Sequence, residues 1–146
     1  MQKAVAIGEA STQSGIKVPT IRYYEQIGLM PEVERSEGNR RYYEPAEVDR
    51  LRFIRHAREL GFDIEAIKRL LVLQDKPDQS CIEADALARS HLIEVEKRIA
   101  SLTALKAELE RMVKGCSHGH VENCRVIEIL ADHGKCQFHA DHQSTN

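Results

Sequence analysis

The spacing of apolar side chains divides the first part of the chain into short helices. Residues 5–14 carry apolar or small side chains at helical spacing, and Gly15 ends that segment. Pro19 stands where a helix can begin, because the first turn leaves its N–H groups unpaired, and the pattern continues over residues 20–27. Two short helices joined by a tight glycine-containing turn predict a helix-turn-helix.

Residues 29–44 leave the helical pattern. A turn cluster of Ser, Glu, Gly and Asn at residues 36–39 stands between Val33 and the run Arg41-Tyr42-Tyr43. This arrangement predicts a small β-hairpin, a wing beside the two helices.

Two further helices are predicted after the wing, at residues 45–60 and 64–74. Pro45 opens the first and Gly61 ends it, while Asp63 is a suitable N-cap for the second. Each helix has one inward-facing apolar stripe, formed by Val48, Leu51 and Ile54 in the first and by Ile67, Leu70 and Leu71 in the second.

The longest predicted helix spans residues 79–114, after a linker at residues 75–78, and contains no Pro or Gly. It would be about 54 Å long at about 1.5 Å per residue. The head cannot cover so long an apolar stripe, so a second copy of the chain is the expected partner; the alternative is a helix folded back on its own domain. The stripe has nearly the coiled-coil period and consists of Ala88, Leu92, Val95, Ile99, Leu102, Leu105, Leu109 and Met112.

Composition agrees with a mainly helical protein. Hydrophobic residues make up 42% of the 146 positions and aromatic residues only 5%, with no Trp, which favours helices with a modest core over a β-sandwich. No segment resembles a signal peptide, and no run of about 20 apolar residues could span a bilayer. We therefore expect a cytoplasmic protein without a membrane partner.

Basic and aromatic side chains stand together at two places in the head. Arg22, Tyr23 and Tyr24 lie early in the second helix, and the wing carries a similar group. Such groups can contact phosphates and the sugar backbone, and Arg22 could reach a base edge. The net charge of −2 gives no bulk attraction to nucleic acid, so local geometry must supply the binding face. One of the two adjacent tyrosines is expected in the core, because neighbouring helix positions do not share a face.

The run IGEASTQSGIKVPTIRYYEQIGLMPEVERSEGNRRYYEPAEVDRLRFI resembles the N-terminal half of the MerR family of transcription regulators. The similarity continues through LGFDIEAIKRLL and covers about residues 5–130. It implies a winged helix-turn-helix homodimer, joined by antiparallel coiled-coil helices, on a pseudo-palindromic promoter. The DNA contacts that we expect are Lys17, Thr20, Arg22, Tyr23, Tyr24, Arg40, Arg41 and Tyr42.

The resemblance also implies a mechanism. Family members bind a promoter whose spacer is too long for RNA polymerase, and effector binding changes the relative pose of the two heads. The DNA is then kinked and undertwisted, so that the promoter elements realign, which uses sequence-dependent DNA deformability. The dimer would be the two-state element that the effector biases.

Four cysteines in a reducing compartment are more often ligands or reactive thiols than disulfides. Cys81 lies at the start of the long helix, Cys116 at its end, and Cys124 before a short final helix at residues 125–133. In the antiparallel dimer that the resemblance implies, Cys81 of one chain approaches Cys116 and Cys124 of its partner. The helix dipole would favour a thiolate at Cys81.

The loop CSHGHVENC resembles the metal-binding loop of the family's heavy-metal branch. Copper, silver and gold sensors carry Ser at the position of Cys81, whereas sensors of divalent ions carry Cys. We therefore expect a divalent ion, zinc first, with His118 or His120 supplying a nitrogen ligand. The loop lacks the second Cys of the zinc sensors at Ser117, which leaves cadmium and lead as candidates. A monovalent-ion sensor and a thiol metal-buffering protein are the alternatives.

Three domains are expected: a DNA-binding head at 1–76, a dimerisation helix at 77–115, and a metal-binding loop, short helix and tail at 116–146. An iron–sulfur sensor needs four closely spaced cysteines, and a multidrug sensor needs a large C-terminal domain, so neither fits. The chain shows no nucleophile–base pair or phosphate loop, and we expect no enzyme. The expected function is metal-dependent activation of efflux or resistance genes with RNA polymerase as partner. The tail residues Cys136, His139 and His142 have no assigned role.

Overall fold

The computed structural model describes residues 3–31, 42–115, 118–132 and 134. The chain divides into two compact units, residues 1–87 and 88–146. The described part is mainly helical, as the sequence predicts. Its elements in chain order are β1 (Val5–Ala6), α1 (Ile7–Ser14), α2 (Val18–Gln26), β2 (Tyr42–Tyr43), α3 (Pro45–Glu59), α4 (Ile64–Gln74), α5 (Ile82–Lys114), the 3-10 helix η1 (Val121–Asn123) and α6 (Arg125–Ala131).

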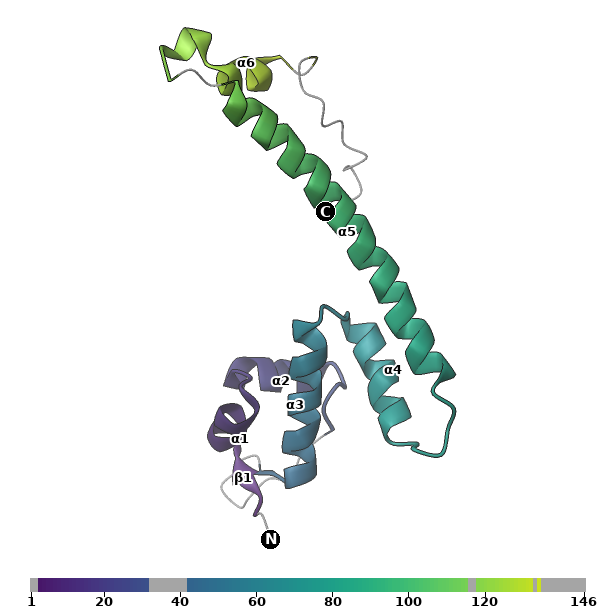
Figure 1. Ribbon diagram of the computed structural model, residues 1–146. Coiled ribbons are helices and arrows are strands. Elements are labelled where there is room, and N and C mark those ends of the chain that lie inside the picture. Colours follow the sequence, from purple (N-terminus) through teal and green to yellow (C-terminus); the bar gives the residue numbers. More distant parts are fainter. Residues whose placement is uncertain (1–2, 32–41, 116–117, 133, 135–146) are drawn as a thin grey trace. The chain divides into compact units, whose positions relative to one another are not determined.

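The predicted helix-turn-helix is confirmed, with α1 and α2 joined by a short turn that begins at Gly15 (Figure 1). Gly15 has a φ of 77°, in the left-handed region, and its N–H donates to the Ser11 carbonyl at 2.8 Å. A glycine adopts this conformation without the steric cost that a Cβ would add. Pro19 lies in the first turn of α2.

Replacing Gly15 with Ala is expected to destabilise the head by about 1–2 kcal/mol, because an L side chain is strained at this φ. The new Cβ would also lie 2.0 Å from Nη1 of Arg55, which must move aside. Gly8→Ala is the matched control, since its Cβ would meet nothing within 4 Å inside α1, and it should stabilise by roughly 0.5–1 kcal/mol. Thermal unfolding followed by circular dichroism measures both; equal melting temperatures for the two variants would contradict this role of Gly15.

The core of unit 1 lies among its first four helices. Ile21 of α2, Leu51 and Ile54 of α3, and Ile67 of α4 have no exposed surface. α3 packs against both α1 and α4, so it is the central helix of the head. α4 begins as predicted, because the Asp63 carboxylate accepts a hydrogen bond from the Ala66 N–H at 2.7 Å.

The two short strands form an antiparallel pair, with Val5 opposite Tyr43 and Ala6 opposite Tyr42. Tyr43 is fully buried, and its hydroxyl donates a hydrogen bond to Glu25 of α2. Most of the predicted wing, residues 32–41, lies outside the described residues. The pairing of its last strand with the beginning of the chain was not predicted.

α5 begins at Ile82 rather than at residue 79 and ends at Lys114 as predicted. The Cys81 carbonyl accepts the first helical hydrogen bond, from Asp85 N–H at 2.9 Å. The Ser80 hydroxyl accepts from the Ile82 N–H at 3.3 Å. Ser80 and Cys81 therefore form the start of the helix.

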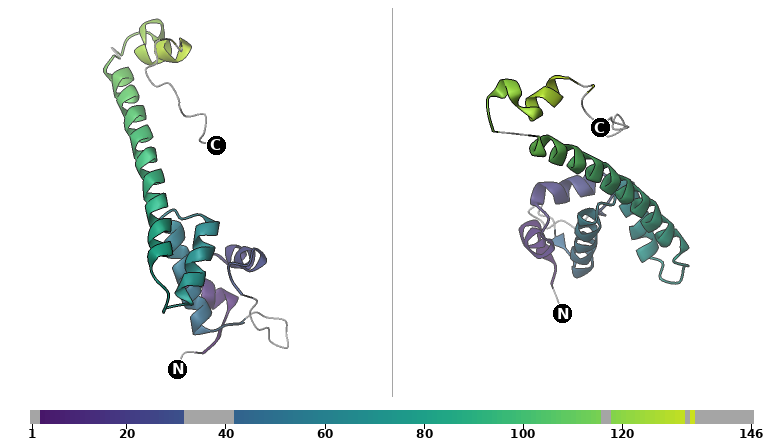
Figure 2. Two further views of the ribbon diagram at one scale, coloured as in Figure 1. Left: turned by 90° about the vertical axis from the view of Figure 1, so that its right-hand side faces the viewer. Right: turned by 45° about the horizontal axis from the view of Figure 1, so that its top comes forward.

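In unit 2, α6 lies beside the C-terminal end of α5 (Figures 1 and 2). Met112 of α5 and Ile129 of α6 are its buried apolar residues among those described. Gly115 has no room for a side chain, because a Cβ there would come within 2.4 Å of Cγ of Arg125. α6 ends at Ala131, short of the predicted residue 133.

The apolar stripe of α5 is mostly open to solvent in the single chain. Leu92, Ile99, Leu102 and Leu109 are each more than half exposed, and Met112 is the only stripe residue that is buried. Three residues of the stripe, Leu102, Leu105 and Leu109, line a groove of about 470 Å³ together with Val113, which lies outside the stripe. Among the described helices, none combines the length and the apolar character that a bilayer crossing requires.

Candidate DNA-contacting surface and metal ligands

α2 is anchored on the core by one face and presents the other to solvent. Ile21 and Tyr24 are buried, whereas Arg22 and Tyr23 are exposed. Of the two adjacent tyrosines, Tyr24 is therefore the core residue, at 8% exposure against 51% for Tyr23. Arg22 and Tyr23 are the members of this group that an external ligand can reach.

The other candidate contacts of the head differ in accessibility. Lys17 is exposed at the N-cap of α2, and its carbonyl accepts from the Thr20 N–H at 2.9 Å. Thr20 is half-buried, and Tyr42 is 37% exposed. The wing residues Arg40 and Arg41 lie outside the described residues. The structure thus describes Lys17, Arg22 and Tyr23 as the exposed candidates around α2.

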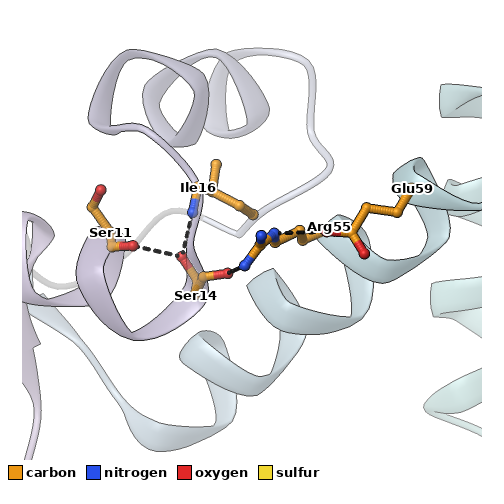
Figure 3. Close-up of polar contacts among 5 residues, drawn as sticks. All are labelled: Ser11, Ser14, Ile16, Arg55 and Glu59. Atoms are coloured by element: carbon orange, nitrogen blue, oxygen red, sulfur yellow. Dashed lines mark hydrogen bonds and ion pairs between the residues drawn. The ribbon is translucent and has the colours of Figure 1, made fainter.

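Two arginines of α3, which sequence reasoning did not single out, hold the end of α1. The last carbonyls of a helix have no partner within it, and here Arg52 Nε donates to the Gln13 carbonyl at 3.2 Å. Arg55 Nη1 donates to the Ser14 carbonyl at 3.5 Å, while its Nε pairs with Glu59 at 2.9 Å (Figure 3). These contacts fix the helix-turn-helix on α3. The only signal in the sequence was their spacing of three along one helix.

The turn itself is held by the buried hydroxyl of Ser14, which is 2% exposed. Its Oγ accepts a hydrogen bond from the Ile16 N–H at 3.2 Å and donates to the Ser11 carbonyl at 3.5 Å (Figure 3). A buried hydroxyl with both donor and acceptor satisfied fixes the local backbone. The entry of the chain into α2 is set by this contact.

The candidate metal ligands fall in both units. Cys81 is an exposed free thiol in unit 1, at the N-cap of α5. Cys124 lies in unit 2 directly before α6 and is half-buried. Cys116 lies outside the described residues. Cys81 and Cys124 are thus separated in the chain by the whole of α5.

The two loop histidines, His118 and His120, are exposed. His118 has a φ of 58°, and His120 precedes η1, where its carbonyl accepts from the Asn123 N–H at 3.0 Å. Within the described ranges of the single chain, no three His, Cys, Asp or Glu side chains are grouped as a metal site. Free thiols and imidazoles are nevertheless the donors that zinc, cadmium and lead take. These donor types fit such an ion.

Comparison with known proteins assigns a family to most of the chain. The sequence model of the "MerR HTH family regulatory protein" matches residues 5–73, and that of "MerR, DNA binding" matches residues 48–112. Heavy metal-dependent transcription regulator 2 of Rhizobium meliloti (strain 1021) is 39% identical over 86% of this chain and 86% of its own. The HTH-type transcriptional regulator ZntR of Escherichia coli (strain K12) is 38% identical over 85% of this chain and 90% of its own.

Solved structures show the same fold. The transcription regulator PbrR691 from Ralstonia metallidurans CH34, in complex with lead(II), has a TM-score of 0.74 and 35% identity over 89% of this chain and 99% of its own. The regulator MerR from Bacillus megaterium MB1, in complex with mercury(II), has a TM-score of 0.64 and 28% identity over 84% of this chain and 95% of its own. Both similarities include the head and the long helix.

Proposed function

Because the chain belongs to the MerR family of transcription regulators, we propose that it binds promoter DNA as a homodimer and activates transcription when a divalent heavy-metal ion binds. The observation that carries the proposal is the combination of a helix-turn-helix head with cysteine thiols before and after one long helix. The names of the relatives, which include a heavy metal-dependent regulator and a lead(II) complex, support metal as the effector.

DNA binding is assigned to the exposed face of α2. Arg22 and Tyr23 are exposed on α2, the second helix of the helix-turn-helix. A guanidinium can contact phosphate or a guanine edge, and an exposed tyrosine can donate to phosphate. Lys17 adds a positive charge at the start of the same helix, and the wing residues Arg40, Arg41 and Tyr42 would reach flanking phosphates.

Replacing Arg22 with Ala is expected to weaken promoter binding in both the metal-free and the metal-loaded protein. Loss of one charge-assisted DNA contact costs about 1–3 kcal/mol, roughly a 5- to 150-fold loss of affinity. Fluorescence anisotropy with the promoter upstream of the protein's own gene measures it at fixed salt. Lys97→Ala, which removes an exposed charge from α5, is the control and should leave the affinity unchanged. Unchanged affinity of the Arg22 variant together with a lost metal response would place Arg22 in signalling instead.

In a homodimer, the second copy of the chain would supply the metal ligands that one chain does not bring together among its described residues. α5 has 33 residues, about 50 Å of helix, so its two ends are far apart along the helix axis. In an antiparallel pair of such helices, Cys81 of one chain meets Cys116 and Cys124 of its partner. The exposed apolar stripe of α5 would be buried in the same interface, which gives the dimer its stability.

A divalent ion suits this donor set better than a monovalent one. Three thiolates carry three negative charges, of which a divalent ion offsets two, and zinc prefers four N or S ligands. His118 or His120 could complete a zinc site, whereas cadmium or lead could be held by thiolates. When bound, the ion would crosslink the loop at residues 116–124 of one chain to the start of α5 in the other. The heads, attached to α5 through α4, would then change their pose on the promoter and present it to RNA polymerase in an active geometry.

A thiol metal buffer remains the second candidate function, on the observation that the loop donors are exposed. A buffer would bind zinc without sequence-specific DNA binding. Anisotropy with the promoter and with a scrambled duplex of equal length separates the two functions, because a buffer gives equal and weak binding to both.

A further inference from the structure

Two arginines of α3 contact the end of α1, where the chain turns into α2. Arg52 Nε donates to the Gln13 carbonyl at 3.2 Å. Arg55 Nη1 donates to the Ser14 carbonyl at 3.5 Å (Figure 3). The Arg55 guanidinium also lies close to the turn, since a Cβ on Gly15 would lie 2.7 Å from its Cζ. The two guanidiniums therefore hold the last residues before the helix that carries the candidate DNA contacts.

Apolar packing holds one side of this turn, and polar contacts hold another. Ala10 of α1 and Ile16 after the turn are buried in the core of the head. A hollow of about 400 Å³ lies between the end of α1 and α3, and the described side chains that line it are all polar or charged, namely Gln13, Ser14, Arg52, Arg55, His56 and Glu59. On this side, hydrogen bonds from the two arginines take the place of apolar contacts.

Each of the two arginines is also paired with a carboxylate. Arg52 Nη1 lies 3.0 Å from Oδ1 of Asp49, and Arg55 Nε lies 2.9 Å from Oε1 of Glu59. Two guanidiniums and two carboxylates leave the group without formal net charge, so it offers no net attraction to a polyanion. The guanidiniums divide their donors between backbone carbonyls and carboxylates of the same head. This arrangement suits a structural tie better than a phosphate contact.

We infer that Arg52 and Arg55 are positioning residues for promoter recognition: they hold the start of α2 in the pose that reads the promoter and do not contact DNA themselves. The inference rests on the DNA binding of the proposed function. The first residues of a recognition helix reach base edges, and here Lys17 is the N-cap of α2. Only molecules with α2 in this pose bind the promoter tightly, so the apparent affinity falls with their fraction. Non-specific DNA is bound through phosphate charge and does not require the pose.

The variant Arg52→Met/Arg55→Met of the full-length protein tests this, because methionine has no donor for the two carbonyls. The ratio of promoter affinity to the affinity for a scrambled duplex of equal length should fall about fivefold or more, since two hydrogen bonds are lost. Fluorescence anisotropy at several salt concentrations should give the wild-type slope of log affinity against log salt, because no phosphate contact is removed. Amide exchange in residues 11–16 of the DNA-free protein should become faster.

Asp49→Asn/Glu59→Gln is the matched variant, because it removes the two carboxylates and leaves both carbonyl contacts. The side chains of Asp49 and Glu59 are 73% and 58% exposed, and exposed ion pairs contribute little to stability. The affinity ratio, the salt slope and the exchange of residues 11–16 should all stay as in the wild type. Tighter DNA binding with a steeper salt slope would show that the released guanidiniums reach phosphates, and it would overturn the inference.

The remaining outcomes separate the inference from the proposed function. A wild-type affinity ratio in Arg52→Met/Arg55→Met, or a salt slope reduced as expected for Arg22→Ala, would overturn the inference. If the double variant does not fold, Arg52→Met and Arg55→Met decide singly by the same ratio, since each keeps one carbonyl contact. A wild-type protein that binds the promoter and the scrambled duplex equally would refute the proposed function, and the inference with it. A wild-type preference for the promoter that both single variants retain would overturn the inference alone.

Discussion

Replacing Cys81 with Ser is expected to abolish induction by zinc, cadmium and lead while promoter binding stays intact. The exposed thiol at the start of α5 is the third of three proposed thiolates, and divalent ions prefer more than two ligands. Cys81 is not one of the candidate DNA contacts of the head, so its replacement should leave those contacts unchanged. Two thiolates, Cys116 and Cys124, still suffice for linear coordination, and a residual response to a monovalent ion would agree with this account.

The measurement is a transcription reporter titrated with zinc, cadmium, lead, mercury, copper and silver in the wild type and in Cys81→Ser. Cys136→Ser is the control, since it removes a tail thiol that has no assigned role, and it should respond like the wild type. A wild type that responds only to copper or silver, with Cys81→Ser unaffected, would refute the divalent assignment. Cys81 would then be a structural thiol.

The double variant Leu102→Asp/Leu109→Asp is expected to convert the dimer to monomers and to weaken promoter binding with it. Both side chains are more than half exposed in the single chain, so the change costs the protomer fold little. Burying a leucine contributes about 1.5–3 kcal/mol; four are lost per dimer and four charges are added. The dimer should weaken by at least about a thousandfold.

Light scattering on a sizing column at micromolar concentration measures the mass of each variant. Ala104→Asp, an exposed position on another face of α5, places the same charge outside the stripe and should leave the dimer intact. A dimer that survives in the Leu102/Leu109 variant would show that this stripe is not the interface. The shared metal site would then lose its basis.

Local signals in the sequence predicted most helix boundaries, because they are set by residues next to them. Gly15 ends α1 through its positive φ, and Asp63 caps α4 through a hydrogen bond to a residue three positions on. The start of α5 was predicted three residues early. The helix begins at Ile82, where the Ser80 hydroxyl and the Cys81 carbonyl accept hydrogen bonds from N–H groups of the first turn. Helix propensity alone does not predict these contacts.

Contacts between distant segments were not predicted. The pairing of Val5 with Tyr43 joins residues far apart in the chain, and neither strand is long enough to show an alternating pattern. The two arginines Arg52 and Arg55 were not singled out in the sequence, yet they hold the carbonyls at the end of α1. The burial of Glu108 was not predicted either, because the sequence pattern of α5 alone does not mark this position as covered.

For the candidate sites, the sequence supplied the residue types and the structure supplied their accessibility. The structure shows that Tyr24 is buried whereas Tyr23 is exposed, and that Lys17 and Arg22 are exposed at α2. The thiols were assigned from their spacing and from the family resemblance. Their assembly into one metal site depends on a second chain, and this stays a prediction.

The central claim is that a divalent metal ion controls transcription through this protein, and in vitro transcription tests it most directly. Purified protein and RNA polymerase are combined on the promoter upstream of the protein's own gene, with zinc, cadmium or lead titrated into the reaction. The account predicts that transcript rises by about tenfold or more with metal, while promoter occupancy measured by footprinting in the same samples changes little. Metal-independent transcript at full occupancy, or no occupancy of any tested promoter at physiological salt, would contradict it.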